Sequence, residues 1–392
     1  MKQILFISWE NIPFYRESWA KVDFNPRDFT DTGQLSQLPF IDKDIVRENF
    51  QRLLNPNISN KRRFRVSTGG SSGRQMEFIQ SSNVWWKELA FFHSIILEYG
   101  YKNRMRKASF RGGEFPGRFS YFSENPIHNE LCFSPFHLSK KTVSKYVERL
   151  KREKIEFLHC YPSAILNLMS LMKVGGYSLD RPLKAIFLIS ENFTQSQANE
   201  LERFFSCKVM SFYGHSERLI IAPSYGVTTN YRVDQRYGFF ELIGKDGEAI
   251  TTNTVEGEMV GTSFDNYAMP LIRYRTGDHT SFVDIDNQVV SGVAGRWGQD
   301  VLLGLNNEEV TLTALNIHSD VFSNVTNYQF FQKDKGKVTI RVLPGVGFSP
   351  ECEQAILKAH QVKVNGVITF SIEKVDRLKT SVRGKYLRVV NS

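Results

Sequence analysis

The chain has 392 residues, which is enough to bury a large core and to form two domains or more of ordinary size. Hydrophobic residues make up 41% and charged residues 23% of the chain, a composition that excludes a disordered protein. No apolar run reaches membrane-spanning length, and the segment from Met1 to Trp9 is too short for a secretory signal. We therefore expect a cytoplasmic protein without stable membrane insertion.

The net charge of +9 raises the question of nucleic-acid binding. The basic residues are spread over several stretches, such as Lys61 to Arg65 and Lys140 to Lys154, and form no nucleic-acid motif. Attraction for an anionic substrate explains this modest excess, so we expect no nucleic-acid partner. A steeply salt-dependent affinity for DNA or RNA would indicate the opposite. The cysteines lack the paired spacing of zinc sites and disulfide frameworks, and we expect thiols in the core: Cys132, Cys160, Cys207 and Cys352.

A glycine-rich stretch, Thr68-Gly69-Gly70-Ser71-Ser72-Gly73, is the first candidate for function. Its glycines permit close approach of the backbone to an anion, and its hydroxyls donate to phosphate oxygens. It is not a Walker A loop, because Arg74 and not lysine follows Gly73. A flexible surface loop is the alternative interpretation.

Helices are predicted on both sides of this stretch. Asp42 or Asp44 is suited to cap a helix that runs to Leu54, where Asn55-Pro56 would end it. A second helix begins near Asn83, and its apolar side chains fall on one face, which we expect to be packed: Trp85, Leu89, Phe92 and Ile96.

The middle of the chain alternates strand and helix patterns. This alternation predicts a sheet covered by helices, with sites at the carboxyl ends of its strands. The predicted elements are strand Ile155 to Cys160, a helix from Tyr161-Pro162-Ser163 to Met172, strand Ala185 to Ile189, helix Thr194 to Phe205 and strand Lys208 to Tyr213.

The last part of the chain has a different pattern. Strands without intervening helices predict a more antiparallel subdomain: Phe239 to Ile243, Gly257 to Phe264 and Ser281 to Ile285. Beyond a probable linker at Gly295 to Gly304, a small α+β domain is expected, with strands Asn327 to Lys333, Lys337 to Leu343 and Gly366 to Val375 and a helix near Ser349 to His360.

Three further motifs lie at predicted strand ends or loops. In Tyr213-Gly214-His215-Ser216-Glu217, the tyrosine can stack on a base, the serine can reach a phosphate and the glutamate can ligate Mg²⁺. In Arg273-Tyr274-Arg275-Thr276-Gly277-Asp278, a carboxylate after a glycine turn suits two ribose hydroxyls, and Arg383-Gly384-Lys385 presents a cation. Each motif alone has another interpretation. The first could be a helix start with Ser216 as the N-cap, the second a hairpin turn and the third an exposed tail.

Taken together and in this order, these motifs resemble the adenylate-forming superfamily. More narrowly, the chain is similar to the phenylacetate-CoA ligase family and its capsule-polysaccharide-biosynthesis relatives. Further counterparts are the segment from Leu38-Pro39 to Asp44 and the turn Tyr161-Pro162-Ser163-Ala164. The resemblance covers essentially the whole chain. It implies an α/β fold with a large adenylation domain (1–295), built of α/β subdomains and a more antiparallel one, and a small mobile α+β domain (296–392).

The resemblance also implies roles for matching positions. Lys385 and Glu217 would be catalytic, with Glu217 holding Mg²⁺. ATP or AMP would contact Thr68, Ser71, Ser72, Gly73, Ser190, Glu191, Asn192, Tyr213, Gly214, Ser216, Asp278 and Arg296. Among these, Tyr213 and 190–192 would lie at the adenine and Asp278 at the ribose. The acyl pocket would include Phe91, Phe115, Tyr161, Phe212 and His215, and Asp300 would be the hinge.

The implied activity is an AMP-forming carboxylate ligase that uses ATP and Mg²⁺ and releases pyrophosphate. Its acyl-AMP would pass the acyl group to coenzyme A or, alternatively, to an amine or hydroxyl of an amino acid or sugar. Two departures from the family motifs favour a different alternative, a non-catalytic nucleotide-binding scaffold. Gly69 stands where the family has a serine, and Trp297-Gly298-Gln299-Asp300 lacks the family's paired aspartates. The presence of Glu217, Asp278 and Lys385 argues against that scaffold.

Overall fold

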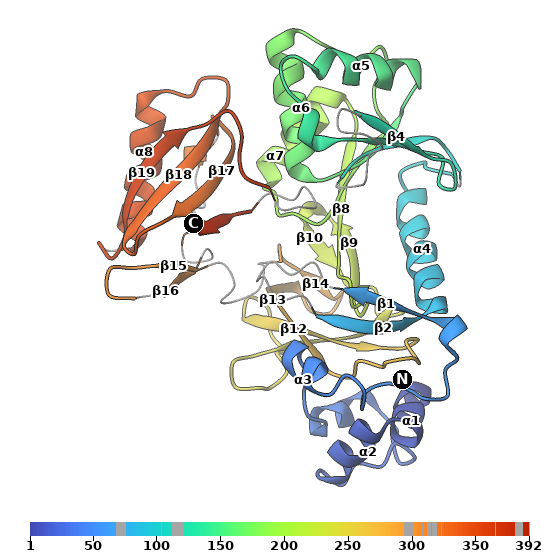
Figure 1. Cartoon of the computed structure of the whole chain (residues 1–392). Helices are drawn as coiled ribbons and strands as arrows, with labels where there is room; N and C mark the ends of the chain where they lie inside the picture. The colour runs from blue at the N-terminus through green and yellow to red at the C-terminus, as the bar shows by residue number, and fades with distance from the viewer. Residues whose placement is uncertain are drawn as a thin grey trace. The chain divides into compact units, whose positions relative to one another are not determined.

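The computed structural model describes residues 1–67, 76–102, 104–111, 121–293, 301–307, 309–311, 315, 320–322, 324–364, 366–380 and 387–391. The chain, traced in Figure 1, divides into two compact units, each built from two segments. The first unit comprises Met1–Tyr101 and Ser211–Arg296, and the second comprises Lys102–Met210 and Trp297–Ser392. Among the residues described, no helix is long and apolar enough to cross a membrane.

The first unit contains an antiparallel run of strands in the order β11-β12-β13-β14-β10-β9-β8. The strands are β8 (Lys208–Gly214), β9 (Ile221–Tyr225), β10 (Val227–Arg232), β11 (Gly238–Ile243), β12 (Glu256–Ser263), β13 (Tyr274–Asp284) and β14 (Val289–Val290). The predicted antiparallel subdomain is confirmed. The strand predicted at Ser281 to Ile285 is the end of the much longer β13, which begins inside the Arg-Tyr-Arg-Thr-Gly-Asp motif.

A two-stranded hairpin and several helices complete this unit. They are α1 (Lys2–Asn11), α2 (Pro13–Ala20), η1 (Thr32–Gln37), α3 (Lys43–Glu48), η2 (Asn60–Arg62), β1 (Arg63–Ser67), β2 (Glu77–Ser81) and α4 (Ser82–Leu97). Figure 1 shows α1 and α2 in dark blue next to each other. Tyr15 and Trp19 of α2 are fully buried, and the Tyr15 hydroxyl donates to the carbonyl of Pro270 at 2.7 Å. The N-terminal segment therefore belongs to the core of the first unit.

Two sequence predictions for these helices need correction. Asp42 caps α3 by accepting from the backbone N–H groups of Asp44 and Ile45, both at 2.9 Å, but the helix ends at Glu48 and not at Leu54. It ends there because Asn49 leaves the helical conformation and its side-chain amide donates to the Ile45 carbonyl at 3.0 Å.

The apolar face predicted for α4 is only partly covered. Within this helix, whose residues are all described, Val84 and Ile96 are buried, whereas Trp85, Leu89 and Phe92 are half-buried. The helix is packed on one side, as predicted, but of the four predicted residues only Ile96 is fully buried, and Val84 is buried as well.

The second unit contains a mostly parallel run of strands in the order β7-β6-β3-β5-β4, of which only β4 is antiparallel. Its elements up to Met210 are β3 (Lys107–Phe110), β4 (Phe122–Asn125), β5 (Glu130–Phe133), η3 (Pro135–His137), α5 (Val143–Arg152), β6 (Phe157–Cys160), α6 (Pro162–Gly175), β7 (Ala185–Leu188) and α7 (Gln195–Phe205). Alternate strand residues pack with the helices in one apolar core that includes Phe110, Tyr146 and Ile165. The predicted βα alternation is confirmed.

The C-terminal part of the second unit is a small α+β domain, as predicted. Its sheet has the order β19-β18-β17-β20, and α8 packs on it through Ile356 against a core that includes Ile340 and Phe370. The elements are β15 (Val301–Leu303), β16 (Glu309–Thr311), η4 (Asp320–Phe322), β17 (Val325–Gln332), β18 (Lys337–Pro344), α8 (Pro350–Val364), β19 (Thr369–Lys374) and β20 (Val389–Asn391).

The linker predicted at Gly295 to Gly304 is partly wrong. Residues 301–303 form β15, which pairs with β16 in a two-stranded hairpin, so they are ordinary strand. The earlier residues of that stretch, up to 300, and with them the boundary predicted between 295 and 296, lie outside the described residues.

Candidate active site

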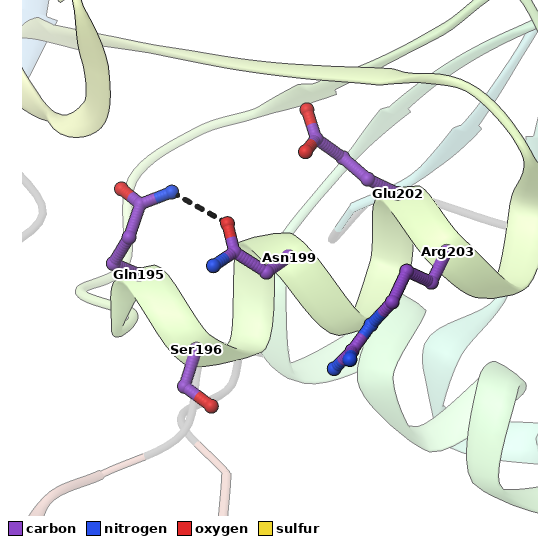
Figure 2. A pocket seen from close by; sticks show the side chains of 5 residues that line it. All are labelled: Gln195, Ser196, Asn199, Glu202 and Arg203. Carbon is purple, nitrogen blue, oxygen red and sulfur yellow. Dashed lines mark hydrogen bonds between the residues drawn. The ribbon is translucent and has the colours of Figure 1, made fainter.

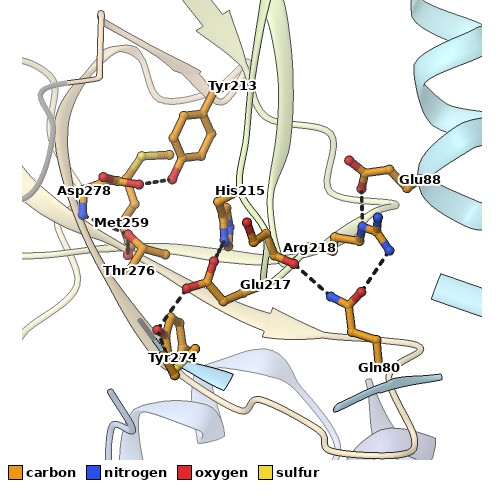
Figure 3. A network of polar contacts seen from close by, with 12 residues as sticks. Gln80, Glu88, Tyr213, His215, Glu217, Arg218, Met259, Tyr274, Thr276 and Asp278 are labelled. Carbon is orange, nitrogen blue, oxygen red and sulfur yellow. Dashed lines mark hydrogen bonds and ion pairs between the residues drawn. The ribbon is translucent and has the colours of Figure 1, made fainter. Parts of the chain in front are cut away.

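Two motifs that are 65 residues apart in sequence meet in the first unit. The hydroxyl of Tyr213, near the end of β8, donates to Asp278 Oδ2 of β13 at 2.7 Å. Burial and the Asp278 carboxylate raise the pKa of Tyr213 well above its ordinary value, so the tyrosine stays protonated and keeps donating. Figure 3 shows this contact together with the polar network around it.

Asp278 owes its position to a β-bulge. The register between β12 and β13 shifts just before Asp278, and Gly277 takes a left-handed φ of 73° that favours glycine. Glu258 of β12 holds the bulge, because its two oxygens accept from the Gly277 N–H at 2.9 Å and from Arg275 Nε at 2.6 Å. The glycine "turn" expected here, and the hairpin alternative, are therefore both wrong: the motif lies inside one continuous strand.

The threonine of the motif locks the same bulge from the other side. Thr276 Oγ1 donates to the Met259 carbonyl at 2.7 Å and accepts from the Asp278 N–H at 3.1 Å. The backbone N–H groups of Gly277 and Asp278 are thus both paired with side chains at the bulge. Its carboxylate is presented from a rigid element rather than from a loose turn.

Glu217 is the second carboxylate of the network. Its side chain is 4% exposed and lies in the loop after β8, where Oε2 is 3.0 Å from His215 Nδ1 and Oε1 accepts from the Tyr274 hydroxyl at 3.1 Å. No helix follows β8, so the interpretation of Ser216 as a helix N-cap is wrong. The loop instead brings Glu217 to the start of β13.

Gln80 of β2 fixes the backbone of this loop. Its Nε2 donates to the Ser216 carbonyl at 2.9 Å, and its Oε1 accepts from Arg218 Nη1 at 2.9 Å. Arg218 lies 3.7 Å from the Glu88 carboxylate of α4 and has a left-handed φ of 56°. Figure 3 shows this chain of contacts from Gln80 to Glu88, which ties the candidate site to the hairpin and to α4.

Arg273 opens the motif 273–278, but the sequence analysis assigned it no role. It is 3% exposed and makes a two-pronged ion pair with Glu241 of β11, with Nη2 to Oε1 at 2.9 Å and Nε to Oε2 at 3.2 Å. Its Nη1 donates to the carbonyls of Ser36 and Leu38 at 3.0 and 2.8 Å, and its guanidinium lies over the Phe40 ring at 4.0 Å. Its position directly before Tyr274 was the only signal.

The segment around Ile41 joins the same region. Ile41 forms a parallel bridge with Tyr274, in which its N–H donates to the Arg273 carbonyl at 3.1 Å and its carbonyl accepts from the Arg275 N–H at 2.8 Å. The two sequence motifs 38–44 and 272–278 are therefore physically paired. Each supports the position of the other.

His279, the residue after Asp278, gives this site a measurable pH dependence. It is 7% exposed, and burial, reinforced by Arg275 and Lys245, lowers its pKa from 6.5 to about 4. The unfolded chain then binds more protons between pH 6.5 and 4, so the free energy of unfolding should fall by about 3 kcal/mol as the pH drops through that window. Denaturant unfolding at pH 7 and pH 4 should show a smaller loss for His279→Gln. An equal loss in both proteins would contradict this.

In the second unit, two predicted residue groups follow neighbouring parallel strands. Ser190 has a left-handed φ of 63°, and Glu191 Oε2 accepts from the Ser163 N–H at 3.0 Å, in the first turn of α6. The carboxylate of Glu191 therefore satisfies one free N–H at the start of that helix. Tyr161 is the N-cap residue of α6 and is buried. Glu191 holds the two strand ends together.

Two of the aromatic residues predicted for the acyl pocket pack on rings that were not part of that prediction. In the first unit, Phe212 of β8 packs on Phe92 with ring centroids 5.3 Å apart, and Phe91 packs on Tyr237 at 5.1 Å. Tyr161 belongs to the second unit. The remaining predicted residues lie outside the described part of the chain: Thr68, Ser71, Ser72, Gly73, Phe115, Arg296, Asp300 and Lys385.

Other features of the described residues give weaker evidence for a functional site. Among the described residues, no group of three or more His, Cys, Asp or Glu side chains is arranged to hold a metal ion. A surface hollow along α7, shown in Figure 2, is lined by residues of that helix alone, and several of its polar groups already have partners. Glu202 accepts from the Val209 N–H at 3.0 Å, and Gln195 donates to Asn199 at 2.8 Å. The polar network of Figure 3 is therefore the candidate site.

Relatives of the chain point to one family. No family model matches it. Protein CapK of Staphylococcus aureus is 23% identical over 352 residues, which cover 84% of this chain and 74% of the relative. Phenylacetate-coenzyme A ligase of Aromatoleum evansii is 23% identical over an alignment of 418 residues, which covers 98% of this chain and 91% of the relative.

A solved structure shows the same fold. 2-Hydroxyisobutyryl-CoA ligase, in its postadenylation state with R3-HIB-AMP, superimposes with a TM-score of 0.71 at 15% identity, over 100% of this chain and 88% of that one. In sequence the chain is similar to phenylacetate-coenzyme A ligases and to Protein CapK, and its fold is that of an adenylate-forming ligase. The fold class predicted for such a ligase, a large N-terminal α/β part with a smaller C-terminal α+β domain, is confirmed.

Proposed function

We propose that this chain is an AMP-forming carboxylate ligase. It activates a carboxylic acid with ATP as an acyl-AMP, releases pyrophosphate, and transfers the acyl group to an acceptor. The observation that carries the proposal is the contact between Tyr213 and Asp278, with Glu217 in the same network. An aromatic ring, a carboxylate for a diol and a buried carboxylate near the phosphates are the groups that a nucleotide requires.

The residues present fit a bound nucleotide. Asp278 stands on a rigid bulge, and a carboxylate with two oxygens accepts hydrogen bonds from the two ribose hydroxyls. Tyr213 remains protonated beside it, so its ring is held in place for stacking on adenine. Ser216, whose carbonyl is fixed by Gln80, has its hydroxyl free to approach the α-phosphate from an exposed loop position.

Glu217 fits Mg²⁺ as a single carboxylate ligand. Mg²⁺ commonly binds through one or two carboxylates together with substrate phosphates and water, so a cluster of three protein ligands is not required. The two Glu217 oxygens contact His215 and Tyr274, and because each oxygen of a carboxylate has two lone pairs, these contacts do not exclude a bound cation. Bound there, Mg²⁺ would supply charge neutralisation at the phosphates.

The chemistry follows from charge. A carboxylate oxygen of the acid attacks the α-phosphorus, the bond from that phosphorus to the bridging oxygen breaks, and pyrophosphate leaves. Both reactants are anionic, so the protein acts mainly by positioning them and by supplying cations. Lys385, assigned through the family motif, is proposed to place its ammonium at the α-phosphate.

The small C-terminal domain is proposed to move between the two half-reactions. We retain the domain boundary between 295 and 296, with Arg296 at the junction and Asp300 as the hinge residue. Such a rotation withdraws Lys385 after adenylation and admits the acceptor, and linker residues absorb the change in backbone angles.

Coenzyme A is the proposed acceptor, because relatives that align over most of the chain are phenylacetate-coenzyme A ligases. Its sulfur attacks the acyl carbonyl, AMP leaves, and the thiol proton is released. The match to Protein CapK, which is not named as a CoA ligase, favours a second candidate: transfer to an amine or hydroxyl. A non-catalytic scaffold is the further alternative.

The test is ATP–pyrophosphate exchange with Mg²⁺ and a panel of carboxylic and amino acids, in the absence of CoA. Exchange with one acid would support adenylation and identify the acyl donor. The acyl acceptor is then identified by adding CoA, amines or sugars and measuring which of them causes AMP release. ATP binding without exchange for any acid would favour the scaffold.

Replacing Asp278 with asparagine should raise the KM for ATP by about 10- to 100-fold, because a hydrogen bond to a charged group is lost for each ribose hydroxyl it holds. The asparagine carbonyl can still accept from Tyr213, so the fold of the site is kept. Asp286→Asn, an exposed position beyond the same strand, serves as the control. An unchanged KM for ATP in Asp278→Asn would refute the ribose role.

A further inference from the structure

Gln329 of β17 is a buried glutamine of the small C-terminal domain, and its side chain bonds to backbone groups from a distant part of the chain. Its exposed fraction is 0%. Nε2 donates to the Lys379 carbonyl at 3.1 Å and to the Leu387 carbonyl, and Oε1 accepts from the Lys379 N–H at 3.3 Å. Both donors of the amide therefore hold two residues that lie 50 and 58 positions further along the chain.

The two residues held by this amide form the base of one segment. The Leu387 N–H donates to the Lys379 carbonyl at 3.3 Å, so the chain leaves and returns at the same place. Leu378, directly before this base, is buried, and β20, which follows it, pairs in parallel with β17. Lys385 lies between the two ends in the sequence. The glutamine thus joins the two ends of the segment that carries the proposed catalytic lysine.

A glutamine at this buried position requires an explanation. Burying an amide costs free energy unless its polar atoms are paired, and an apolar side chain of similar volume would pack in the sheet without that cost. What the amide adds is direction, because its hydrogen bonds fix where two backbone carbonyls lie. Functional side chains carried on loops depend on such supporting hydrogen bonds for their geometry.

We propose that Gln329 is a positioning residue for Lys385. By joining Lys379 to Leu387, it fixes the base of the segment that carries the lysine and so limits where the ammonium is placed. This inference rests on the proposed adenylation activity and on the role proposed for Lys385 within it. Because Gln329 is fully buried, it acts through the lysine, and a misplacement of about 1 Å in an active site can cost about 100-fold in rate.

The first test is Gln329→Met, which keeps the length and volume of the side chain and removes its three hydrogen bonds. Single-turnover formation of acyl-AMP should become about 10- to 100-fold slower, while the ATP and acid concentrations that give half the maximal rate stay within about 3-fold. The rate alone should change because the ammonium acts on charge that develops during attack. Hydrogen exchange at residues 379 and 387 should become faster, which reports on the base of the segment without any activity.

Gln332 of the same strand offers a matched control. It is 7% exposed, and its amide makes the same kind of bonds to another segment: Nε2 donates to the Leu303 carbonyl and Oε1 accepts from the Leu303 N–H, both at 2.7 Å. Gln332→Met perturbs the same small domain elsewhere and should slow acyl-AMP formation by less than about 3-fold. Thermal unfolding checks that the variants are folded. If Gln329→Met is not, Gln329→Asn, whose amide reaches one carbon less far, provides the same test.

The Lys385→Ala background shows whether the two residues act together. In that background, Gln329→Met should change the rate of acyl-AMP formation by less than about 2-fold, because no ammonium is left to position. A glutamine that only stabilised the domain would instead lower the rate by the same factor with and without the lysine.

The outcomes separate this inference from the function on which it rests. No exchange with any acid in the original chain overturns the proposed function and this inference with it. If Lys385→Ala keeps the original rate, the role of the lysine and this inference fall together, while adenylation stands. The inference alone is overturned by an unchanged rate in folded Gln329→Met, by an equal loss in Gln332→Met, or by the full loss in the Lys385→Ala background.

Discussion

Replacing Lys385 with alanine should lower the rate of acyl-AMP formation by about 1000-fold while leaving the affinity for ATP within a few-fold of its original value. The reason is that the ammonium is proposed to neutralise charge that develops at the α-phosphate during attack. Removing one such charge-stabilising donor from an active site commonly costs about 100- to 1000-fold in rate, and a negatively charged nucleophile adds to this. Binding of ATP itself is proposed to rely on Asp278 and the glycine-rich stretch.

The measurement is single-turnover formation of acyl-AMP together with equilibrium binding of ATP. Lys358→Ala is the matched control, because Lys358 is an exposed lysine of α8 in the same small domain. Acyl-AMP formation at the original rate in Lys385→Ala would refute the assignment. A loss of ATP affinity equal to the loss of rate would instead indicate that the lysine already contacts ATP before the reaction.

Replacing Arg273 with methionine should destabilise the first unit by about 3–5 kcal/mol, the usual result of removing one partner of a buried ion pair. Glu241 would be left at 10% side-chain exposure without its cation. Burial already raises the pKa of Glu241, and Arg273 opposes that rise, so the carboxylate would lose its main stabilising contact. The carbonyls of Ser36 and Leu38 would lose their donor as well.

Tryptophan fluorescence during urea unfolding reports on this unit, because four of the chain's five tryptophans lie in Met1–Tyr101. The double variant Arg273→Met with Glu241→Leu should recover most of the lost stability, since no buried charge remains. Arg47→Met, which breaks an exposed pair with Asp44 in the same unit, should cost less than about 1 kcal/mol. A loss of that small size for Arg273→Met would contradict the role of the buried pair.

Asp278 shows what a local sequence pattern can predict and what it cannot. A glycine before a carboxylate predicts a tight backbone position, and Gly277 does have the left-handed φ that this requires. Whether such a glycine makes a hairpin or a bulge depends on the partner strand, and here Glu258 of β12 holds an uninterrupted strand. The residue was predictable, but the element that presents it was not.

Arg273 and Gln80 show the opposite case. Gln80 belongs to no motif, and Arg273, although it opens the Arg-Tyr-Arg-Thr-Gly-Asp motif, has no local sign of burial, because a buried arginine is recognised only by the partner that neutralises it. Glu241 lies 32 positions from Arg273, and Ser216 lies 136 positions from Gln80. Helix α5 was missed for a related reason: its basic residues suggested a solvated stretch, although Tyr146, Val147 and Leu150 form a buried face.

The sequence by itself determined the fold class, the order of most elements after residue 155, and the motifs that resemble the adenylate-forming ligases. Local periodicity and turn residues are sufficient for these, because they depend on near neighbours in the chain. The tertiary structure alone decided that Tyr213 meets Asp278 and that Glu217 lies between His215 and Tyr274. These are contacts between distant segments, and their hydrogen-bond partners are fixed by strand register and bulges, which no local pattern specifies.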